Sequence, residues 1–500
     1  MKLPRICFAA CLFATVATSL MAAVSPSSGD WTIVSRKGDK LYEGDREFRF
    51  LGLDSPNLLI NESQLYPDMH NRFPDEFEMR DTLAGLQYLG TRATRTFTLS
   101  IAASEDKGVP VYITGLGTYN EEAFRALDRL LALCKQYDVR LIIPIVASQQ
   151  FYGIRGVDQI SVLSGKPAGS FWTDERQKSE YKALLRYLVN RRNTVDGLLY
   201  KDEPAILAWQ FGNEFDSYAP DRKLDEARIR KLVTDWSLEM SAYLKSIDPK
   251  HLIIEAGGDK ERLIADPNID IISIHLYEYW AKLSGYPGEH SPEALRTWSA
   301  VKGHKALIID EFGMASFENN RALMETIRKN GITGGLLWSI RAHRRDGGWY
   351  CHNEGGSIYN SYHVPGFATG RAYDEEKTLD LLRSEAFAIR GLPVPPVAAP
   401  SVAPVLIRVK DGFSWRGSAL ASHYSIARAP KPNGPWTTVA TGLVDSVVVD
   451  AEKYEASGDY LPPVLWSDEY ARSGETWYYR VQAHNAGGDS DESPVVEVRY

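Results

Sequence analysis

Two glutamates end apolar runs in which a carboxylate has no stabilising role. Glu214 follows residues 209–213, and Glu311 follows residues 306–310. Short apolar runs of this kind are typical of strands that are buried on both faces. Two carboxyl groups brought together can protonate a leaving group and stabilise the positive centre that it leaves, which is the chemistry of glycosidic bond cleavage. One such glutamate alone is better explained as the partner of an arginine or as the cap of the next turn, but the pair favours a glycosidase.

The elements that would position this pair alternate along the chain. Between residues 47 and 392, strand-like segments are separated by amphipathic helix-like segments such as 120–137 and 173–192. Eight strands are predicted, at 48–53, 91–97, 139–146, 206–213, 251–256, 269–275, 305–310 and 332–339. Eight such units predict an α/β fold of the (β/α)8 TIM-barrel type, whose active site collects at the C-terminal ends of the strands. Both glutamates lie at such ends.

A second, all-β domain is predicted after the barrel. Residues 393–404 are rich in proline, which neither pairs inside a sheet nor continues a helix, so they predict a stiff linker. Short β-like segments broken by turns fill residues 405–500, with Trp415 early and Trp477 late. This pattern resembles an immunoglobulin-like sandwich of the fibronectin type III kind. Trp415 and one of the late tyrosines are then expected in its core.

The first 23 residues have the architecture of a signal peptide. A basic start is followed by an apolar stretch over residues 6–20 and by small residues up to Ala23. We therefore expect residues 24–392 to be the catalytic barrel of an exported protein. Its destination could be the periplasm, the cell surface or the medium.

Composition argues against several kinds of partner. The net charge is −8 and no basic run is present, which disfavours binding to nucleic acid or to an anionic membrane surface. No metal-ligand spacing or phosphate-cradling glycine loop is found, so neither a cofactor nor a metal is expected, and no membrane insertion is predicted. Cys134 and Cys351 are the cysteines outside the leader, and the sequence leaves both their pairing and the oligomeric state open.

Residues 200–214 resemble the acid/base strand of glycoside hydrolase family 5, most closely its mannanase and mannosidase branch. The other matches are Arg95, before this segment, and His275, Tyr277, Glu311 and Trp338, after it. They stand in the order expected of the family. The matches together cover about residues 45–390. The resemblance implies a retaining enzyme in which Glu311 is the nucleophile and Glu214 the acid/base.

The resemblance also implies supporting roles near Glu311. Arg95 would keep Glu311 ionised, and Tyr277 would donate a hydrogen bond that orients it. The structural alternative for Arg95 is an ordinary ion pair in the barrel core.

Three more residues are expected to meet the sugar. Asn213 would hydrogen-bond the 2-hydroxyl, His275 would contact the substrate or Glu214, and Trp338 would offer a flat apolar face to the sugar before the scissile bond. The alternatives are structural: asparagine often ends a strand, a lone histidine is usually a packed one, and a tryptophan can close a barrel core.

The expected function is hydrolysis of β-1,4-mannosidic bonds in mannan or manno-oligosaccharides by double displacement, as an endo-mannanase or an exo-mannosidase. Two alternatives are a β-1,4-glucanase of the same fold and a carbohydrate-binding or adhesion protein with an inactive barrel. The loop after the eighth strand could block one end of a cleft and make the enzyme exo-acting. It carries His343, Arg344, Trp349 and Tyr350, which either build outer sugar subsites or pack locally.

Overall fold

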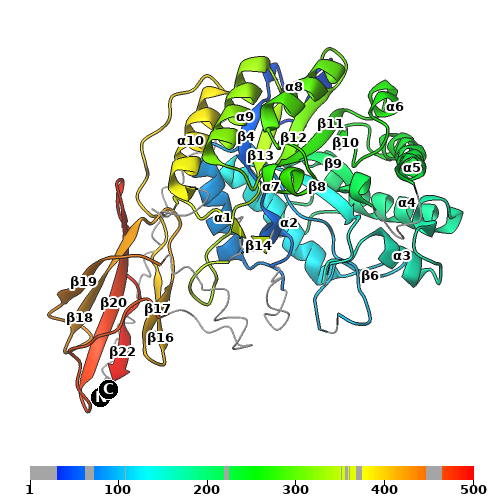
Figure 1. The fold of residues 1–500 in the computed structure, drawn as a ribbon. Helices are drawn as coiled ribbons and strands as arrows, with labels where there is room; N and C mark the ends of the chain where they lie inside the picture. The colour runs from blue at the N-terminus through cyan, green and yellow to red at the C-terminus, as the bar shows by residue number, and fades with distance from the viewer. Residues whose placement is uncertain are drawn as a thin grey trace, which may run out of the picture.

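The computed structural model describes residues 31–61, 72–106, 108–151, 153–218, 225–350, 352–354, 358–359, 361–366, 374–445 and 464–500. A barrel of strands and helices is followed by a smaller β region at the C-terminal end of the chain (Figure 1). The predicted signal peptide and Cys351 lie outside the described residues, whereas Cys134 is a buried free thiol.

Eight parallel strands form the nearly closed barrel that the sequence predicts. They are β4 (Phe50–Leu53), β5 (Ala93–Arg95), β8 (Arg140–Ala147), β9 (Ile206–Asn213), β10 (Leu252–Ile254), β11 (Ile271–Tyr277), β12 (Ala306–Gly313) and β13 (Gly334–Leu337). Their order in the sheet is β4-β13-β12-β11-β10-β9-β8-β5. The amide of Ser55 donates to the carbonyl of Arg95 at 2.8 Å and joins the two ends of that order. All eight predicted strands are confirmed, with differences only at their ends.

A small antiparallel sheet closes the N-terminal end of the barrel. It consists of β1 (Ser35–Lys37), β2 (Lys40–Glu43) and β3 (Arg46–Glu47). Leu41 and Phe48 from this segment join one buried apolar cluster with barrel residues such as Ile142 and Ile308. Because this end is filled, the opposite end, where the strands finish, is the one that can hold a site.

Helices cover the outside of the barrel (Figure 1). They are α1 (Glu76–Tyr88), α2 (Glu121–Tyr137), α3 (Val157–Leu163), α4 (Glu175–Asn190), α5 (Glu226–Ile247), α6 (Lys260–Ala265), α7 (Glu278–Leu283), α8 (His290–Val301), α9 (Phe317–Asn330) and α10 (Glu375–Ala388). The predicted helices 120–137 and 173–192 correspond to α2 and α4. Asn120 and Asp174 cap these two helices by accepting hydrogen bonds from first-turn amides.

The C-terminal β region, residues 405–445 and 464–500, contains two antiparallel sheets. One pairs β16 (Val405–Val409) with β17 (Gly412–Arg416); the other contains β18 (His423–Ala429), β19 (Thr437–Leu443), β20 (Thr476–Asn485), β21 (Gly488–Asp489) and β22 (Val496–Arg499). Trp415 and Tyr479 are fully buried in the apolar cluster of the region, as expected. Residues 393–404 connect α10 to β16 without a helix or strand.

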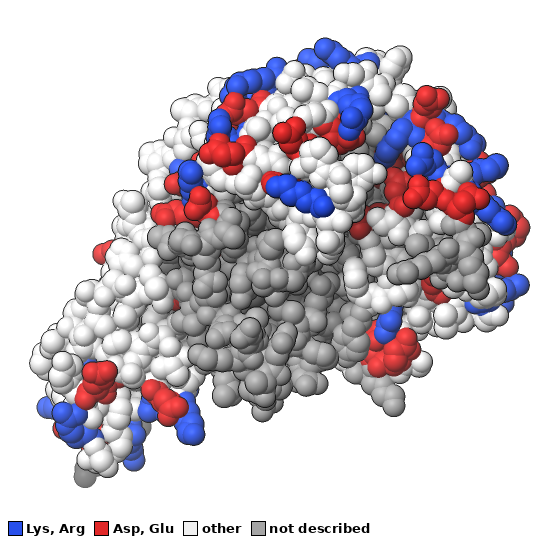
Figure 2. Space-filling view, viewed as in Figure 1, with Lys and Arg blue, Asp and Glu red and all other residues white. Residues whose placement is uncertain are grey.

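Charged side chains of both signs are interspersed over the barrel helices on the face drawn in Figure 2. Mixed charges of this kind are typical of a solvated surface. Within the described part of the chain, every helix is too short or too polar to cross a bilayer.

Candidate active site

Arg95, at the end of β5, connects side chains from two other strands. Its guanidinium is fully buried and donates to Gln210 and Asn213 of β9 at 2.7 Å each, and to Glu311 of β12 at 2.6 Å. A buried guanidinium is tolerated when a carboxylate and further acceptors satisfy its donors, and here they do. The structure thus brings two further predicted site residues, Asn213 and Glu311, together around the Arg95 cation.

Glu214 follows β9 directly and leaves the strand direction. Its backbone φ is 51°, in the left-handed region that non-glycine residues rarely adopt. In a regular strand Asn213 and Glu214 would point to opposite faces. The left-handed residue instead lets both side chains line one cleft, with Gln149 donating to Glu214 and accepting from Asn213 at 3.3 Å.

Glu311 is aimed by an irregularity in β12. The register of β12 against β13 shifts between Ile309 and Phe312, which is the geometry of a bulge. Asp310 and Glu311 therefore both approach Arg95, at 3.6 and 2.6 Å, although neighbours in a regular strand face opposite ways. The hydroxyl of Tyr277 also donates to Glu311.

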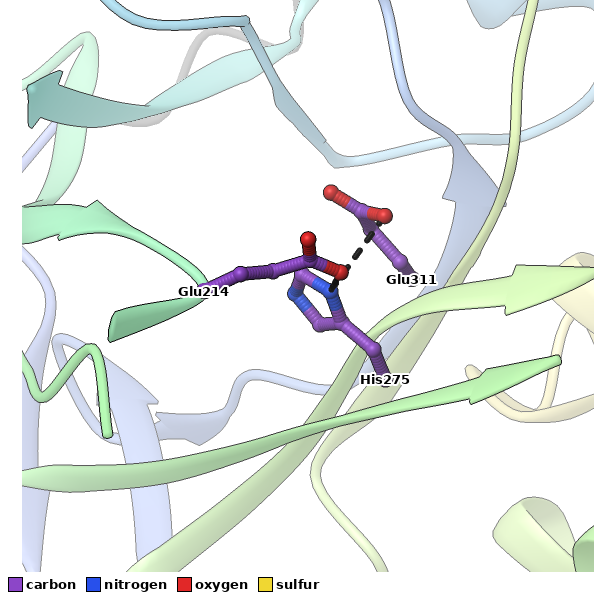
Figure 3. A group of neighbouring side chains, drawn as sticks. All are labelled: Glu214, His275 and Glu311. Carbon is purple, nitrogen blue, oxygen red and sulfur yellow. Dashed lines mark hydrogen bonds and ion pairs between the residues drawn. The ribbon is translucent and has the colours of Figure 1, made fainter. Parts of the chain in front are cut away.

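His275 of β11 lies between the two glutamates (Figure 3). Its Nδ1 is 2.8 Å from Glu214 Oε1 and 3.3 Å from Glu311 Oε2, and its Nε2 is 3.5 Å from Asp310 Oδ1. Burial alone would lower the pKa of His275, but the charges of Glu311 and Asp310 outweigh burial and hold that pKa well above its usual value. These carboxylates therefore favour the protonated ring, in which both nitrogens can donate.

The surrounding charges shift the pKa values of the two glutamates in opposite directions. Burial raises the pKa of both carboxyls. For Glu214, the hydrogen bond and charge of His275, together with the charge of Arg95 and the hydrogen bond of Gln149, outweigh burial and bring the pKa below its usual value. The pKa of Glu311 stays above its usual value because burial and the nearby Glu214 charge outweigh His275 and Arg95. The proton between His275 and Glu214 thus belongs to the pair rather than to either group.

A cleft of ≈ 1240 Å³ opens over this network. Predicted residues in its lining are Asn213, Glu214, His275, Tyr277, Glu311 and Trp338. Trp338 is 6% exposed, and its ring meets Phe97 edge-on at 6.1 Å between centroids. Of the predicted site residues only Arg95 lies outside the lining, directly beneath Glu311.

Four residues of the network were not predicted: Gln149, Gln210, Asp310 and Asp54. Gln149 bonds Glu214; Gln210 accepts from Arg95 and donates to Asp310 at 2.7 Å. Asp54, at the end of β4, is fully buried, and neither of its carboxyl oxygens has a hydrogen-bond partner among the described residues. Their positions at or inside strand ends are the one sequence signal that could have found them.

The loop after β13 does not supply outer subsites from its buried aromatic residues. His343, Trp349 and Tyr350 are all buried and lie outside the cleft lining. The alternative expectation, local packing, is correct for these three side chains. His352, which had no predicted role, does line the cleft.

One group of side chains could hold a metal ion. Glu214, His275 and Glu311 each offer a ligand atom, and these atoms lie within 4.8 Å of one another. In the arrangement observed, Arg95, Tyr277 and Gln149 already occupy the carboxylates with hydrogen bonds.

Comparison with known proteins points to one family. A family model described as "GH family 5 beta-mannosidase-like" matches residues 163–322. Mannan endo-1,4-beta-mannosidase 8 of Oryza sativa subsp. japonica is 32% identical over 276 residues, which are 44% of this chain and 71% of the relative. Mannan endo-1,4-beta-mannosidase 7 of the same species is 29% identical over 364 residues, 62% of this chain and 89% of the relative.

Solved structures share the fold. The endo-1,4-beta-mannanase from Rhizomucor miehei superposes with a TM-score of 0.55 at 18% identity, covering 72% of this chain and 100% of the other. The superposed part is about as long as the barrel region of this chain.

Proposed function

This chain belongs to glycoside hydrolase family 5, a family of retaining enzymes, and on that premise we propose that it hydrolyses β-1,4-mannosidic bonds in mannan or manno-oligosaccharides by double displacement. One observation carries the mechanistic part: oxygens of Glu214 and Glu311 lie within 4.8 Å of each other across His275. Retaining glycosidases hold their two carboxyl groups about 5–5.5 Å apart, close enough for one to attack while the other protonates.

In the first half-reaction, Glu311 attacks the anomeric carbon and the glycosidic bond breaks. Arg95 and Tyr277 bond the two oxygens of Glu311, so they orient the carboxylate and favour its ionised form. The leaving oxygen takes the proton shared by Glu214 and His275. The products are a glycosyl ester on Glu311 and the released leaving sugar, whose former glycosidic oxygen is now a hydroxyl.

In the second half-reaction, water attacks the anomeric carbon of the ester. Glu214, now ionised, accepts a proton from that water, and the bond to Glu311 breaks. The carboxylate of Glu311 and the proton on the Glu214–His275 pair are both restored. In this proposal Asn213 bonds the 2-hydroxyl and Trp338 stacks on the sugar; the contact of Asn213 with Arg95 at 2.7 Å and the position of both residues in the cleft lining support these roles.

The purified mature chain should be incubated separately with mannohexaose, cellohexaose and mannobiose, and the products and their anomeric form followed over time. Internal cleavage of mannohexaose with retention supports an endo-mannanase, and release of single mannose units supports an exo-mannosidase. Activity on cellohexaose alone would replace mannan by a β-glucan as substrate. No hydrolysis of any of the three would favour a binding or adhesion protein.

Two further parts of the proposal concern the ends of the chain. We infer that residues 1–23 export the protein and that the C-terminal β region is a fibronectin type III-like sandwich. Two antiparallel sheets with Trp415 and Tyr479 in their shared core support the second inference. Amino-terminal sequencing of the protein recovered from outside the cytoplasm tests the first.

A further inference from the structure

The segment after β13 is a hairpin flanked on both sides by residues that line the cleft. In residues 341–350, the 341–350 hairpin, His343 and Trp349 are antiparallel partners, and the amide of Tyr350 donates to the carbonyl of Ala342 at 3.0 Å. Trp338 lies just before the hairpin and His352 just after it, and both line the cleft. Their rings are 6.1 Å apart. The hairpin therefore connects two residues of the cleft wall.

One side of the hairpin is fixed to the barrel. Asp81 of α1 accepts from the backbone amide of His343 at 2.9 Å and lies 2.8 Å from its Nδ1. Glu78, one turn earlier, accepts from the hydroxyl of Tyr350 at 2.9 Å and from the amide of Arg345 at 3.2 Å.

The other side of the hairpin is fixed to the C-terminal β region. The Nε2 atom of His343 is 3.0 Å from Asp445 Oδ2, which also accepts from the hydroxyl of Tyr424 at 2.6 Å. Packing here is close: a Cβ atom on Gly417 would stand 2.1 Å from His343 Nε2, and one on Gly347 would stand 2.9 Å from Ser414 Oγ. The hairpin is therefore held between α1 and the β region.

The charges at this contact are complementary. Burial would lower the pKa of His343, but the charge of Asp81 and the hydrogen bond of Asp445 outweigh burial and raise it to about 9. At neutral pH an imidazolium thus donates to one carboxylate from each side. Removing one carboxylate leaves a buried cation half paired, which is strongly unfavourable.

We propose that the C-terminal β region is a positioning element of the cleft: Asp445 anchors His343, and through the 341–350 hairpin it sets the positions of Trp338 and His352. The proposal rests on the proposed function only in that these two rings meet the substrate. His343 and Asp445 are positioning residues, since neither reaches the cleft.

The β region provides a matched control for Asp445. Asp468 is also buried and accepts from the hydroxyl of a core tyrosine, Tyr479, at 2.7 Å. Its cationic partner is Arg428, at 2.6 Å, which belongs to the same β region rather than to the barrel. Asp468→Asn should therefore weaken the β region without releasing the hairpin.

The experiment compares Asp445→Asn and Asp468→Asn in the full chain. Hydrogen–deuterium exchange of peptides covering residues 338–350 reports on the hairpin directly, and steady-state kinetics on mannohexaose report on the cleft. Both variants should lower Tm. Only Asp445→Asn should speed exchange in the hairpin and lower kcat/KM, by roughly tenfold and mainly through a higher KM, because a displaced stacking ring weakens sugar binding.

Equal hairpin exchange and equal kcat/KM in the two variants would overturn the proposal. If the wild-type chain fails to cleave mannohexaose, the proposed function falls, but the exchange comparison still decides whether the β region holds the hairpin. Should Asp445→Asn not fold, Tyr424→Phe and Tyr479→Phe form a milder pair, since each removes one hydroxyl donor from its aspartate. Faster hairpin exchange in Tyr424→Phe alone supports the proposal, and no difference refutes it.

Discussion

Two histidines of this chain lie between carboxylates, one in the cleft and one at the contact between barrel and β region. His275 faces Glu214, Glu311 and Asp310, and its side chain is 15% exposed. His343 faces Asp81 and Asp445, and its side chain is 1% exposed. The pKa values of both are raised by the same kind of partner.

Access to the cleft separates the two histidines. A proton on His275 can pass through Glu214 to a bound substrate, because both side chains line the cleft. A proton on His343 has no such route, so the same chemistry serves to hold two parts of the chain together. Raised histidine pKa values therefore identify a site of chemistry only when a ligand can reach the ring.

The largest expected effect follows from removing the carboxylates beside His275. Glu311→Gln and Glu214→Gln should each lower kcat on mannohexaose by about 10²–10⁴-fold, since each removes a group that acts in the transition state. On an aryl β-mannoside with a good leaving group, formation of the glycosyl-enzyme should recover in Glu214→Gln but not in Glu311→Gln. Asp468→Asn serves as the control, and hydrolysis unchanged in either glutamate variant would refute the assigned roles.

Replacing each histidine by glutamine tests the difference between the two directly. His275→Gln should lower kcat by about 10²-fold and alter the pH dependence of kcat, because the proton shared with Glu214 is lost. His343→Gln should lower Tm and raise KM while leaving the shape of the pH profile of kcat unchanged. Equal pH profiles in the two variants and the wild type would mean that His275 takes no part in proton transfer.

Alkaline pH should weaken the contact between the barrel and the β region. The pKa of His343 in the folded chain is about 9, above the value of about 6.5 expected in the unfolded chain. Its stabilising contribution, on the order of 3 kcal/mol, is thus fully present below pH ~6.5 and is lost as the pH rises through ~9. The facing groups are Asp81, Asp445 and Tyr424, and burial raises the pKa of Tyr424 well above its usual value.

Melting curves between pH 6 and 10 check this expectation. Tm of the wild type should fall across the window, and Tm of His343→Gln should fall less. Parallel curves for the two proteins would show that His343 does not carry the alkaline loss.

Asp54 gives the smallest expected effect on activity. Burial and the charge of Glu311 raise its pKa well above the usual value. Stability is then lost as the pH rises from ~3.9, where the unfolded chain ionises, to the folded pKa. Asp54→Asn should therefore raise Tm at pH 7 more than at pH 4, with kcat within about threefold of the wild type. A lower Tm at pH 7 would indicate an ionised, paired Asp54.

The barrel could be predicted because its strands are buried on both faces and therefore consist of consecutive apolar residues. Glu214 and Glu311 stood out since each interrupts such a run at its end. Gln210 did not stand out, because its role is to accept a hydrogen bond from Arg95, which is 115 residues away. The bulge in β12 and the left-handed backbone of Glu214 also leave no pattern in the local sequence.

The sequence left two roles open for the loop after β13, for a physical reason. A polar and aromatic loop has the composition of a sugar subsite, but the same composition also suits a buried contact in which charges are paired. His343 and Asp445 are 102 residues apart, so only the folded chain reveals that they meet.

The order of the strands in the barrel also constrains folding during synthesis of the chain. β4, the first strand of the barrel, pairs with β13, the last, so a ribosome must release almost the entire barrel sequence before the ring can close. A nascent chain that stops before Gly334 lacks β13 and therefore carries open edges on β4 and β12. Such edges readily recruit strands from other molecules, so truncated products should aggregate rather than accumulate as partly active enzyme.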